Sequence, residues 1–191
     1  TINGATYDSN SPQIDNVAPT ITSVSSSTDN GTYKIGDVIA ITVIFSEAVT
    51  VTGTPQLNLE TGISDTTAGY ASGSDSETLT FNYTVASGHF SSDLDYASTT
   101  ALVLNSGTIK DAVGNAAVLT LPSPGEANSL GSNKAISIDG VAPTLTFTPV
   151  SGGTGVDISS NITLTFSEPV RNLDNSEITD TNVDGLITLK V

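Results

Sequence analysis

The chain carries the stretch Ile14-Asp15-Asn16-Val17-Ala18-Pro19-Thr20 and repeats it as Ile138-Asp139-Gly140-Val141-Ala142-Pro143-Thr144. A second stretch, Phe45-Ser46-Glu47-Ala48-Val49, returns as Phe166-Ser167-Glu168-Pro169-Val170. The two stretches keep their order and nearly the same spacing, which indicates an internal repeat. We therefore expect two homologous modules, each of which begins at a copy of the first stretch.

The repeated Asp-x-Val-Ala-Pro-Thr sequence predicts a short, stiff joint before each module, because a residue that precedes proline is held in extended geometry. The joints set the expected boundaries: residues 15–139 form a complete module, and residues 140–191 form the N-terminal half of a second one. We expect residues 1–14 to be the last strand of a preceding module or a donor strand. No signal peptide opens the chain, so we expect Thr1 to be an internal position of a longer protein.

Apolar and polar residues alternate in the segments after each joint, as they do in half-buried β-strands. The expected strands lie at residues 38–49, 78–85, 101–104 and 134–138, and at 145–147, 162–166 and 187–191 in the second module. Residues expected on inner faces are Ile39, Ile41, Val43, Phe45, Leu79, Phe81, Tyr83 and Val85. We expect no helix beyond a turn or two near residues 91–96. The fold class is therefore predicted as all-β, with immunoglobulin-like β-sandwich modules in tandem.

The chain is strongly acidic, with 20 Asp and Glu residues, 5 Lys and Arg residues and a formal net charge of −15. Such a surface repels phosphate, so we expect neither nucleic acid nor an anionic membrane as a partner. No apolar run approaches the roughly 18 residues of a spanning helix, so membrane insertion is not expected. A surplus of carboxylates recruits cations, and Ca²⁺ prefers oxygen ligands. The absence of cysteine and the acidic composition are compatible with the exterior of a bacterium.

Seven segments of the first module follow one another as Ala18-Pro-Thr-Ile-Thr-Ser-Val, Gly36-Asp-Val-Ile, Phe45-Ser-Glu-Ala-Val, Pro55-Gln-Leu-Asn-Leu, Leu79-Thr-Phe-Asn-Tyr-Thr-Val, Asp93-Leu-Asp-Tyr and Ile109-Lys-Asp-Ala-Val-Gly-Asn. They resemble the repeat modules of giant bacterial surface adhesins, such as those of the cyanobacterial swimming-motility protein. The second module, with Pro149-Val-Ser-Gly-Gly-Thr-Gly-Val and Ile162-Thr-Leu-Thr-Phe-Ser-Glu-Pro-Val, resembles the related bacterial Ig-like domain. The resemblance implies a secreted or cell-surface location, a tandem array and Ca²⁺ at module junctions. It bears on fold more than on function, because such modules also occur in surface layers, filaments and extracellular enzymes.

Acidic residues from three distant segments are expected to meet at one pole of the first module. Asp15 lies in the joint, Glu47 is expected to end the second strand, and Asp111 and Asn115 occupy the loop before the last strands. Because alternate strands of a sandwich run in opposite directions, these segments reach the same pole. Their oxygens, completed by backbone carbonyls and water, are predicted to form a Ca²⁺ cage.

The repeat extends this prediction to the next junction, where Asp139 and Glu168 are expected to take part in a second Ca²⁺ site. Two other interpretations stay open: Asp-x-x-Gly-Asn forms an Asx-type turn, and Glu47 caps a strand or faces solvent. The chain contains no EF-hand pattern.

No residue pattern points to catalysis. His89 is the only histidine, and Ser87-Gly88-His89 lacks a nucleophile-elbow pattern, so we interpret it as a turn. One histidine without cysteine does not make a zinc site. Asp93-Leu94-Asp95 is interpreted as a solvated turn that positions Tyr96. We expect the protein not to be an enzyme.

Three functions remain. The first is a structural or adhesive spacer of an extracellular surface protein, in which Ca²⁺ stiffens the junctions and the partners are neighbouring Ig-like modules. Cell-surface or environmental ligands would then be bound through other domains. The second is a subunit of an extracellular filament or sheath, in which adjacent subunits donate strands to each other. The third is an accessory or carbohydrate-binding module of an exoenzyme, which the low aromatic content, 5% of residues, disfavours.

Overall fold

The computed structural model describes residues 14–150, 154, 157, 159, 161–171 and 177–179. The chain divides into two compact units, of which the first ends at Val141 and the second begins at Ala142. The strand expected in residues 1–14 lies, except for Ile14, outside the described residues, and so does the strand expected at residues 187–191.

The first unit is built around two long strands, β3 (Val38–Thr52) and β6 (Ser76–Thr84). They pair antiparallel with Ile41 opposite Phe81. The predicted inner-face residues of both segments are buried, as strict alternation of side chains across a strand requires. Both strand predictions, and the face that each strand turns inward, are therefore confirmed.

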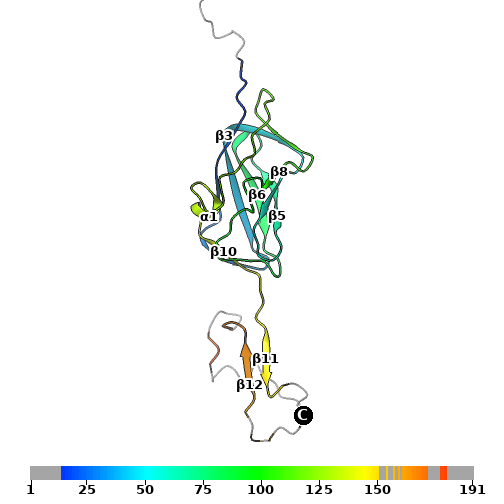
Figure 1. The fold of residues 1–191 in the computed structure, drawn as a ribbon, viewed down its shortest axis with the longest axis vertical. Helices are drawn as coiled ribbons and strands as arrows, with labels where there is room; N and C mark the ends of the chain where they lie inside the picture. The colour runs from blue at the N-terminus through cyan, green and yellow to red at the C-terminus, as the bar shows by residue number, and fades with distance from the viewer. Residues whose placement is uncertain are drawn as a thin grey trace, which may run out of the picture. The chain divides into compact units, whose positions relative to one another are not determined.

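These two strands belong to a larger antiparallel sheet with the order β1-β3-β6-β5-β4-β8 (Figure 1). Its other members are β1 (Ile21–Ser26), β5 (Thr66–Ser72), β4 (Gln56–Leu59) and β8 (Leu102–Val103). The last part of β3 leaves β6 and pairs with β9 (Thr108–Lys110). The strand expected at residues 101–104 is thus present in shortened form.

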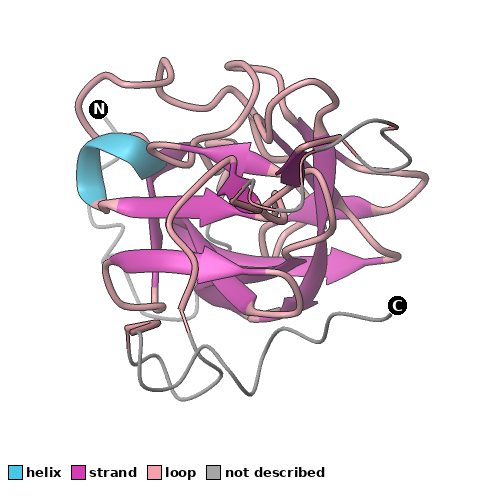
Figure 2. Cartoon of the chain, turned by 90° about the horizontal axis from the view of Figure 1, so that it is seen from below, coloured by secondary structure: helices cyan, strands magenta, loops and turns pink. Residues whose placement is uncertain are grey.

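A smaller sheet has the order β2-β10-β7. It consists of β2 (Gly31–Lys34), β10 (Ile136–Asp139) and β7 (Phe90–Ser91), and β10 runs parallel to β2 and antiparallel to β7. The strand expected at residues 134–138 therefore exists with a shifted start. A single turn of helix, α1 (Leu130–Asn133), precedes it and begins where the hydroxyl of Ser129 accepts the N–H of Ser132. Figure 2 draws the strands in magenta and this helix in cyan.

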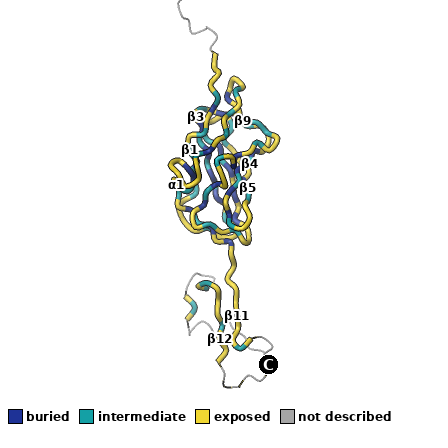
Figure 3. Tube along the Cα trace, viewed as in Figure 1, coloured by how far each residue is buried: buried dark blue, intermediate teal, exposed yellow. Residues whose placement is uncertain are grey.

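One hydrophobic cluster lies inside the first unit, shown in dark blue in Figure 3. Both sheets and α1 contribute to it; among its members are Val24, Phe45, Leu57, Tyr83, Leu130 and Ile136. The unit is thus all-β with curled antiparallel sheets, an arrangement consistent with a β-sandwich. Burial of aliphatic and aromatic side chains drives its folding, since the chain has no disulfide.

The helix expected near residues 91–96 is absent. Residues 90–91 instead form β7, and Tyr96 makes an isolated bridge with Leu59. The backbone N–H of Leu94 donates to the carbonyl of Ile136. The prediction was wrong because contacts with distant strands, which local sequence does not contain, determine the backbone in this segment.

The second unit contains β11 (Leu145–Thr148) and β12 (Thr163–Phe166), which pair antiparallel with Leu145 opposite Phe166. The strands predicted around 145–147 and 162–166 are therefore confirmed. Their apolar side chains are not covered, however: Phe166 is 39% exposed, whereas Phe45, in the first copy of the same stretch, is 2% exposed. The same local sequence thus forms the same hairpin-like pairing in two different surroundings.

Candidate metal centre

Three carboxylates meet at the pole of the first unit where residues 14–19, the leading segment, join it. Asp15, Glu47 and Asp111 each place one carboxylate oxygen within 4.8 Å of the other two. The three residues come from the leading segment, from β3 and from the loop after β9. The predicted convergence of these acids is therefore present in the structure.

Glu47 lies inside β3 and not at its end, which corrects the expected position. The pairing of β3 with β6 shifts register between Ile44 and Val49, so Glu47 sits in an irregular part of the strand. The strand then continues to pair with β9 through Thr50–Thr52. Sequence alternation alone did not reveal this continuation, because β9 is a partner from far along the chain.

Asp111 begins the tight turn that the Asp-x-x-Gly-Asn sequence predicts. Its Oδ1 atom accepts the backbone N–H groups of Val113, Gly114 and Asn115 at 3.0, 2.7 and 2.8 Å. Gly114 has a φ of 103°, a conformation that residues with a side chain rarely adopt. The turn fixes Asp111, which is only 5% exposed, at the cluster.

Asn115 connects this turn to the leading segment. Its Nδ2 atom donates to Asp111 Oδ2 at 2.6 Å and to the carbonyls of Asp15 and Val17 at 3.3 Å each. Asp15 is itself held by the N–H of Val17, which donates to its Oδ1 at 3.0 Å. Asn115 was predicted as a ligand, but the atom that it places at the cluster is a nitrogen donor. In this structure Asn115 positions the oxygens around it.

The electrostatics of the cluster are those of acids without a cationic partner. Partial burial raises the pKa of Glu47, and the neighbouring charges of Asp15 and Asp111 raise it further. Burial also acts to raise the pKa of Asp111, but hydrogen bonds from Asn115, Gly114 and Val113 outweigh it and hold that pKa below its ordinary value. Within the described residues, no lysine or arginine pairs with the cluster.

The donor set fits a hard cation. All three side chains offer carboxylate oxygen, and carboxylate and carbonyl oxygens are the ligands that Ca²⁺ takes. The sulfur and imidazole ligands typical of structural zinc sites are absent from the cluster. Three carboxylates so close together repel one another, and a bound divalent cation would reverse that repulsion. The cluster could therefore hold a metal ion.

The two acids predicted for a second site lie in different units. Asp139 ends β10, and its Oδ1 accepts the N–H of Val141 at 3.2 Å, as Asp15 accepts that of Val17. Glu168 follows β12, and its Oε1 atom is buried without a hydrogen-bond partner. That these two residues share a cation stays a prediction.

Sequence reasoning missed the role of the serine in the repeated Phe-Ser-Glu stretch. The hydroxyl of Ser46 accepts the N–H of Thr20 at 3.0 Å, and that of Ser167 accepts the N–H of Thr144 at 2.9 Å. In both units the serine N–H donates back to the threonine carbonyl. The signal was available in the sequence, because the serine recurs with its threonine in both copies.

His89 and Asp95, which were also singled out from the sequence, have structural partners. His89 follows a turn, and its Nδ1 lies 2.9 Å from the hydroxyl of Tyr83. Asp95 accepts the N–H groups of Tyr96 and Gly125 through its two oxygens, so the predicted role of the acidic pair in positioning Tyr96 rests on Asp95.

Comparisons of the chain with family models, with curated proteins and with solved structures find no match. The adhesin-module resemblance therefore rests on the sequence segments themselves. In the described part of the chain, no helix has the length and apolarity that crossing a bilayer requires.

Proposed function

We propose that this chain is a non-enzymatic structural spacer of a bacterial extracellular surface protein, and that Ca²⁺ stiffens the joint at its leading segment. The observation that carries the proposal is the meeting of Asp15, Glu47 and Asp111. One of these acids belongs to the joint and two belong to the body of the first unit. A cation bound by all three would fasten the joint to the unit.

The repeated contacts around the two joints support a tandem arrangement of Ig-like modules. Thr20 and Ser46 exchange two hydrogen bonds, and Thr144 and Ser167 exchange the same two. Ile21 pairs with Phe45 as Leu145 pairs with Phe166. Two segments that fold alike locally, each behind the same proline-bearing joint, are what a chain of homologous modules would contain.

Thermal unfolding with Ca²⁺ and with a chelator tests the metal. A cation that binds only the folded state stabilises it by about 2.7 kcal/mol at a hundredfold excess over Kd. We expect millimolar Ca²⁺ to raise the melting temperature of the first unit by roughly 5–10 °C. Asp15→Ala and Glu47→Ala should each remove most of that increase.

Glu77→Ala is the matched control, because Glu77 lies in β6 and outside the carboxylate cluster. This variant should keep the full response to Ca²⁺. An equal melting temperature of the unaltered protein in Ca²⁺ and in chelator would remove the metal from the proposal. A spacer without Ca²⁺ would then remain.

A filament subunit is the second candidate, and the second unit favours it. Leu145, Phe147, Ile162 and Phe166 are each between 39% and 53% exposed on β11, β12 and the residue before β12. A strand donated by another copy would cover such apolar side chains by extending the sheet. A native mass that grows with protein concentration would favour this candidate over the spacer.

A further inference from the structure

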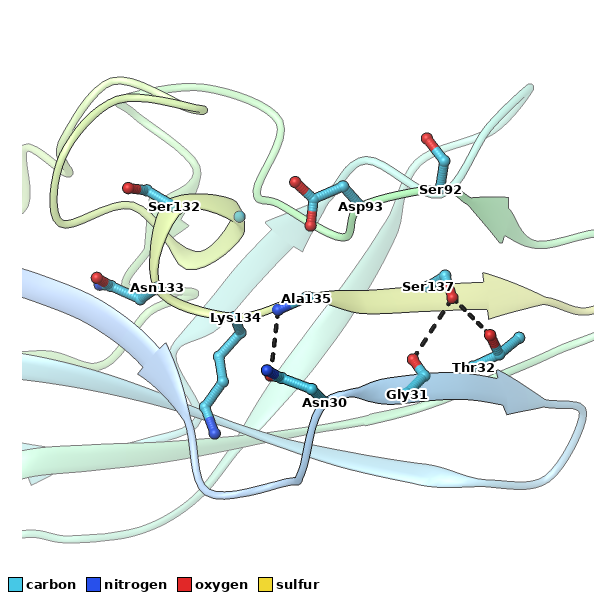
Figure 4. Close-up of a pocket in the computed structure, with 11 residues that line it drawn as sticks. Asn30, Gly31, Thr32, Ser92, Asp93, Ser132, Asn133, Lys134, Ala135 and Ser137 are labelled. Atoms are coloured by element: carbon cyan, nitrogen blue, oxygen red, sulfur yellow. Dashed lines mark hydrogen bonds between the residues drawn. The ribbon is translucent and has the colours of Figure 1, made fainter.

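Two adjoining hollows lie on the first unit, and no residue of the carboxylate cluster lines either of them. The larger, of about 630 Å³, is bounded by α1, β10, β2 and the loop after β7 (Figure 4). The smaller, of about 470 Å³, lies beside β7 and residues 60–63. Ser92 lines both, so they form one continuous surface, which we call the β7 groove.

The larger part of the β7 groove is lined by hydroxyl, amide and carboxylate groups. The hydroxyls of Thr32 and Ser137 lie 2.8 Å apart, and Asn30 Oδ1 accepts the N–H of Ala135 at 3.1 Å. These bonds hold one wall in place (Figure 4). Ser92 and Ser132 line it as well and are exposed. Groups that both donate and accept hydrogen bonds suit a ligand whose own groups do the same.

Asp93 supplies a carboxylate without a partner. Among the described residues it makes no hydrogen bond and no ion pair. Partial burial raises the pKa of Asp93, and the charge of Asp95 raises it further. A Cβ atom on Gly131 would lie 3.3 Å from Asp93 Oδ2, so the missing side chain leaves room for this carboxylate beside α1. An unpaired acceptor at the edge of a polar groove can accept hydrogen bonds from a ligand.

The charges around the β7 groove disfavour an anion. Lys134 lines it, but its ammonium donates to the carbonyl of Thr28 at 3.0 Å. In Figure 4 its side chain extends away from Asp93. The carboxylate of Asp93, on a chain with a net charge of −15, then repels negative ligands. A hydrogen-bond donor that carries no negative charge is the better match.

The smaller part of the β7 groove supplies an apolar platform. Phe90 is 47% exposed, and the neighbouring Ile63 is 95% exposed. The ring of Phe90 lies against Gly62, where a Cβ atom would come within 2.4 Å of it. Gly62 has a φ of 101°, so its backbone also favours glycine. An exposed aromatic ring next to polar groups offers a ligand both an apolar contact and hydrogen bonds.

We propose that the β7 groove binds a neutral oligosaccharide. One sugar ring packs its C–H face on Phe90, and the hydroxyls of the next sugar donate to Asp93 and exchange hydrogen bonds with Ser92 and Ser132. A sugar ring is apolar on its faces and hydroxylated at its edges, which matches the two parts of the groove. This inference is independent of the proposed Ca²⁺ site. The low aromatic content disfavours a carbohydrate-binding module in general, but the exposed ring of Phe90 supplies one apolar platform at this groove.

NMR titration of the full chain tests the proposal. The ¹⁵N-labelled protein, at constant Ca²⁺, is titrated with cellohexaose, chitohexaose and maltohexaose up to about 10 mM, because a shallow surface site with Kd near 1 mM gains only about 4 kcal/mol. At least one of the three should shift the amide signals of residues 90–93 and 130–134. Phe90→Ala and Asp93→Asn should each weaken that binding by about fivefold or more.

Three controls make the test decisive. Glu77→Gln and Val113→Ala, at exposed positions that line neither hollow, should bind as the unaltered protein does. Ser132→Trp should block the larger hollow while Phe90 is kept, so the test remains valid if Phe90→Ala unfolds. The proposal is overturned if none of the three sugars shifts these signals, or if binding survives in all three groove variants. Equal or tighter binding of hexagalacturonic acid would overturn its neutral character.

Discussion

The three clustered carboxylates do not contribute alike to stability. Glu47 has a pKa raised above its ordinary value of 4.5 by partial burial and by Asp15 and Asp111. The contribution of Glu47 to the stability of the folded protein is therefore full below pH 4.5, and it is lost as the pH rises through the folded-state pKa of this residue. In the metal-free protein, Glu47→Gln should raise the melting temperature at pH 7 by a few degrees. Thermal unfolding in chelator from pH 4 to 8 measures this.

Asp111 provides the opposite case as an internal control. Hydrogen bonds lower its pKa, so its contribution is present above the ordinary value of 3.8 and is lost as the pH falls through the lower folded-state value. Asp111→Asn should consequently lower the melting temperature at pH 7. If both substitutions change it in the same direction, the electrostatic account of the cluster is wrong.

Among the elements, the segment that was expected to be helical is held by contacts with distant residues, and the buried Tyr96 makes one of them. Tyr96 is 1% exposed, and its hydroxyl donates to the carbonyl of Pro122 at 2.6 Å. Tyr96→Phe should leave that carbonyl unpaired and lower the free energy of unfolding by about 1–2 kcal/mol. Urea unfolding with an unchanged m value measures the loss.

Tyr33→Phe is the matched control for Tyr96. Tyr33 also donates its hydroxyl to a backbone carbonyl, that of Asp29 at 2.7 Å, but it is only half-buried in β2. Water can replace its hydrogen bond, so this variant should lose less than half as much free energy of unfolding. Equal losses would show that burial does not decide the strength of these bonds.

At the scale of the whole molecule, the two copies of the Phe-Ser-Glu stretch differ in what covers them. Phe45 is 2% exposed in the hydrophobic cluster, and Phe166 is 39% exposed on β12. Phe45→Ala should destabilise the first unit by about 3–5 kcal/mol, as expected for a large cavity. Phe166→Ala should change the stability of that unit by less than about 0.5 kcal/mol.

The tyrosines make this difference measurable. All five tyrosines precede Val141, and the chain has no tryptophan. Near-ultraviolet circular dichroism of tyrosine during urea unfolding therefore reports mainly on the first unit. If the free energy of unfolding measured with this signal falls by several kcal/mol in Phe166→Ala, the two units do not fold independently.

The strands could be predicted where their own residues contain the information. In Thr78 to Val85 polar and apolar residues alternate strictly, and a period of two admits one buried face. The turn at Asp111 could also be predicted, because an aspartate that accepts nearby N–H groups needs only its own loop. The local sequence could not exclude a helix near residues 91–96, because distant residues, Pro122 and Leu59, hold Tyr96 in its observed conformation.

The candidate site could also be predicted only in part. The expected strand directions predicted that Asp15, Glu47 and Asp111 meet, and the structure places one carboxylate oxygen of each within 4.8 Å of the other two. The orientation of Asn115 could not be predicted. Its side-chain nitrogen faces the cluster because it donates to the carbonyls of Asp15 and Val17, which lie far from it in sequence. The polar groove beside Phe90 had no sequence signal, because α1, β2, β10 and β7 contribute to it separately.

By itself, the sequence determined the repeat, the strand faces and the local turn, since each depends on residues that are neighbours along the chain. The tertiary structure alone decided which atom Asn115 places at the cluster, how deeply Asp111 is buried and why Phe45 is covered while Phe166 is not. The physical reason is that burial and charge proximity are properties of the space between segments. Two identical local patterns acquire different roles when different segments pack against them.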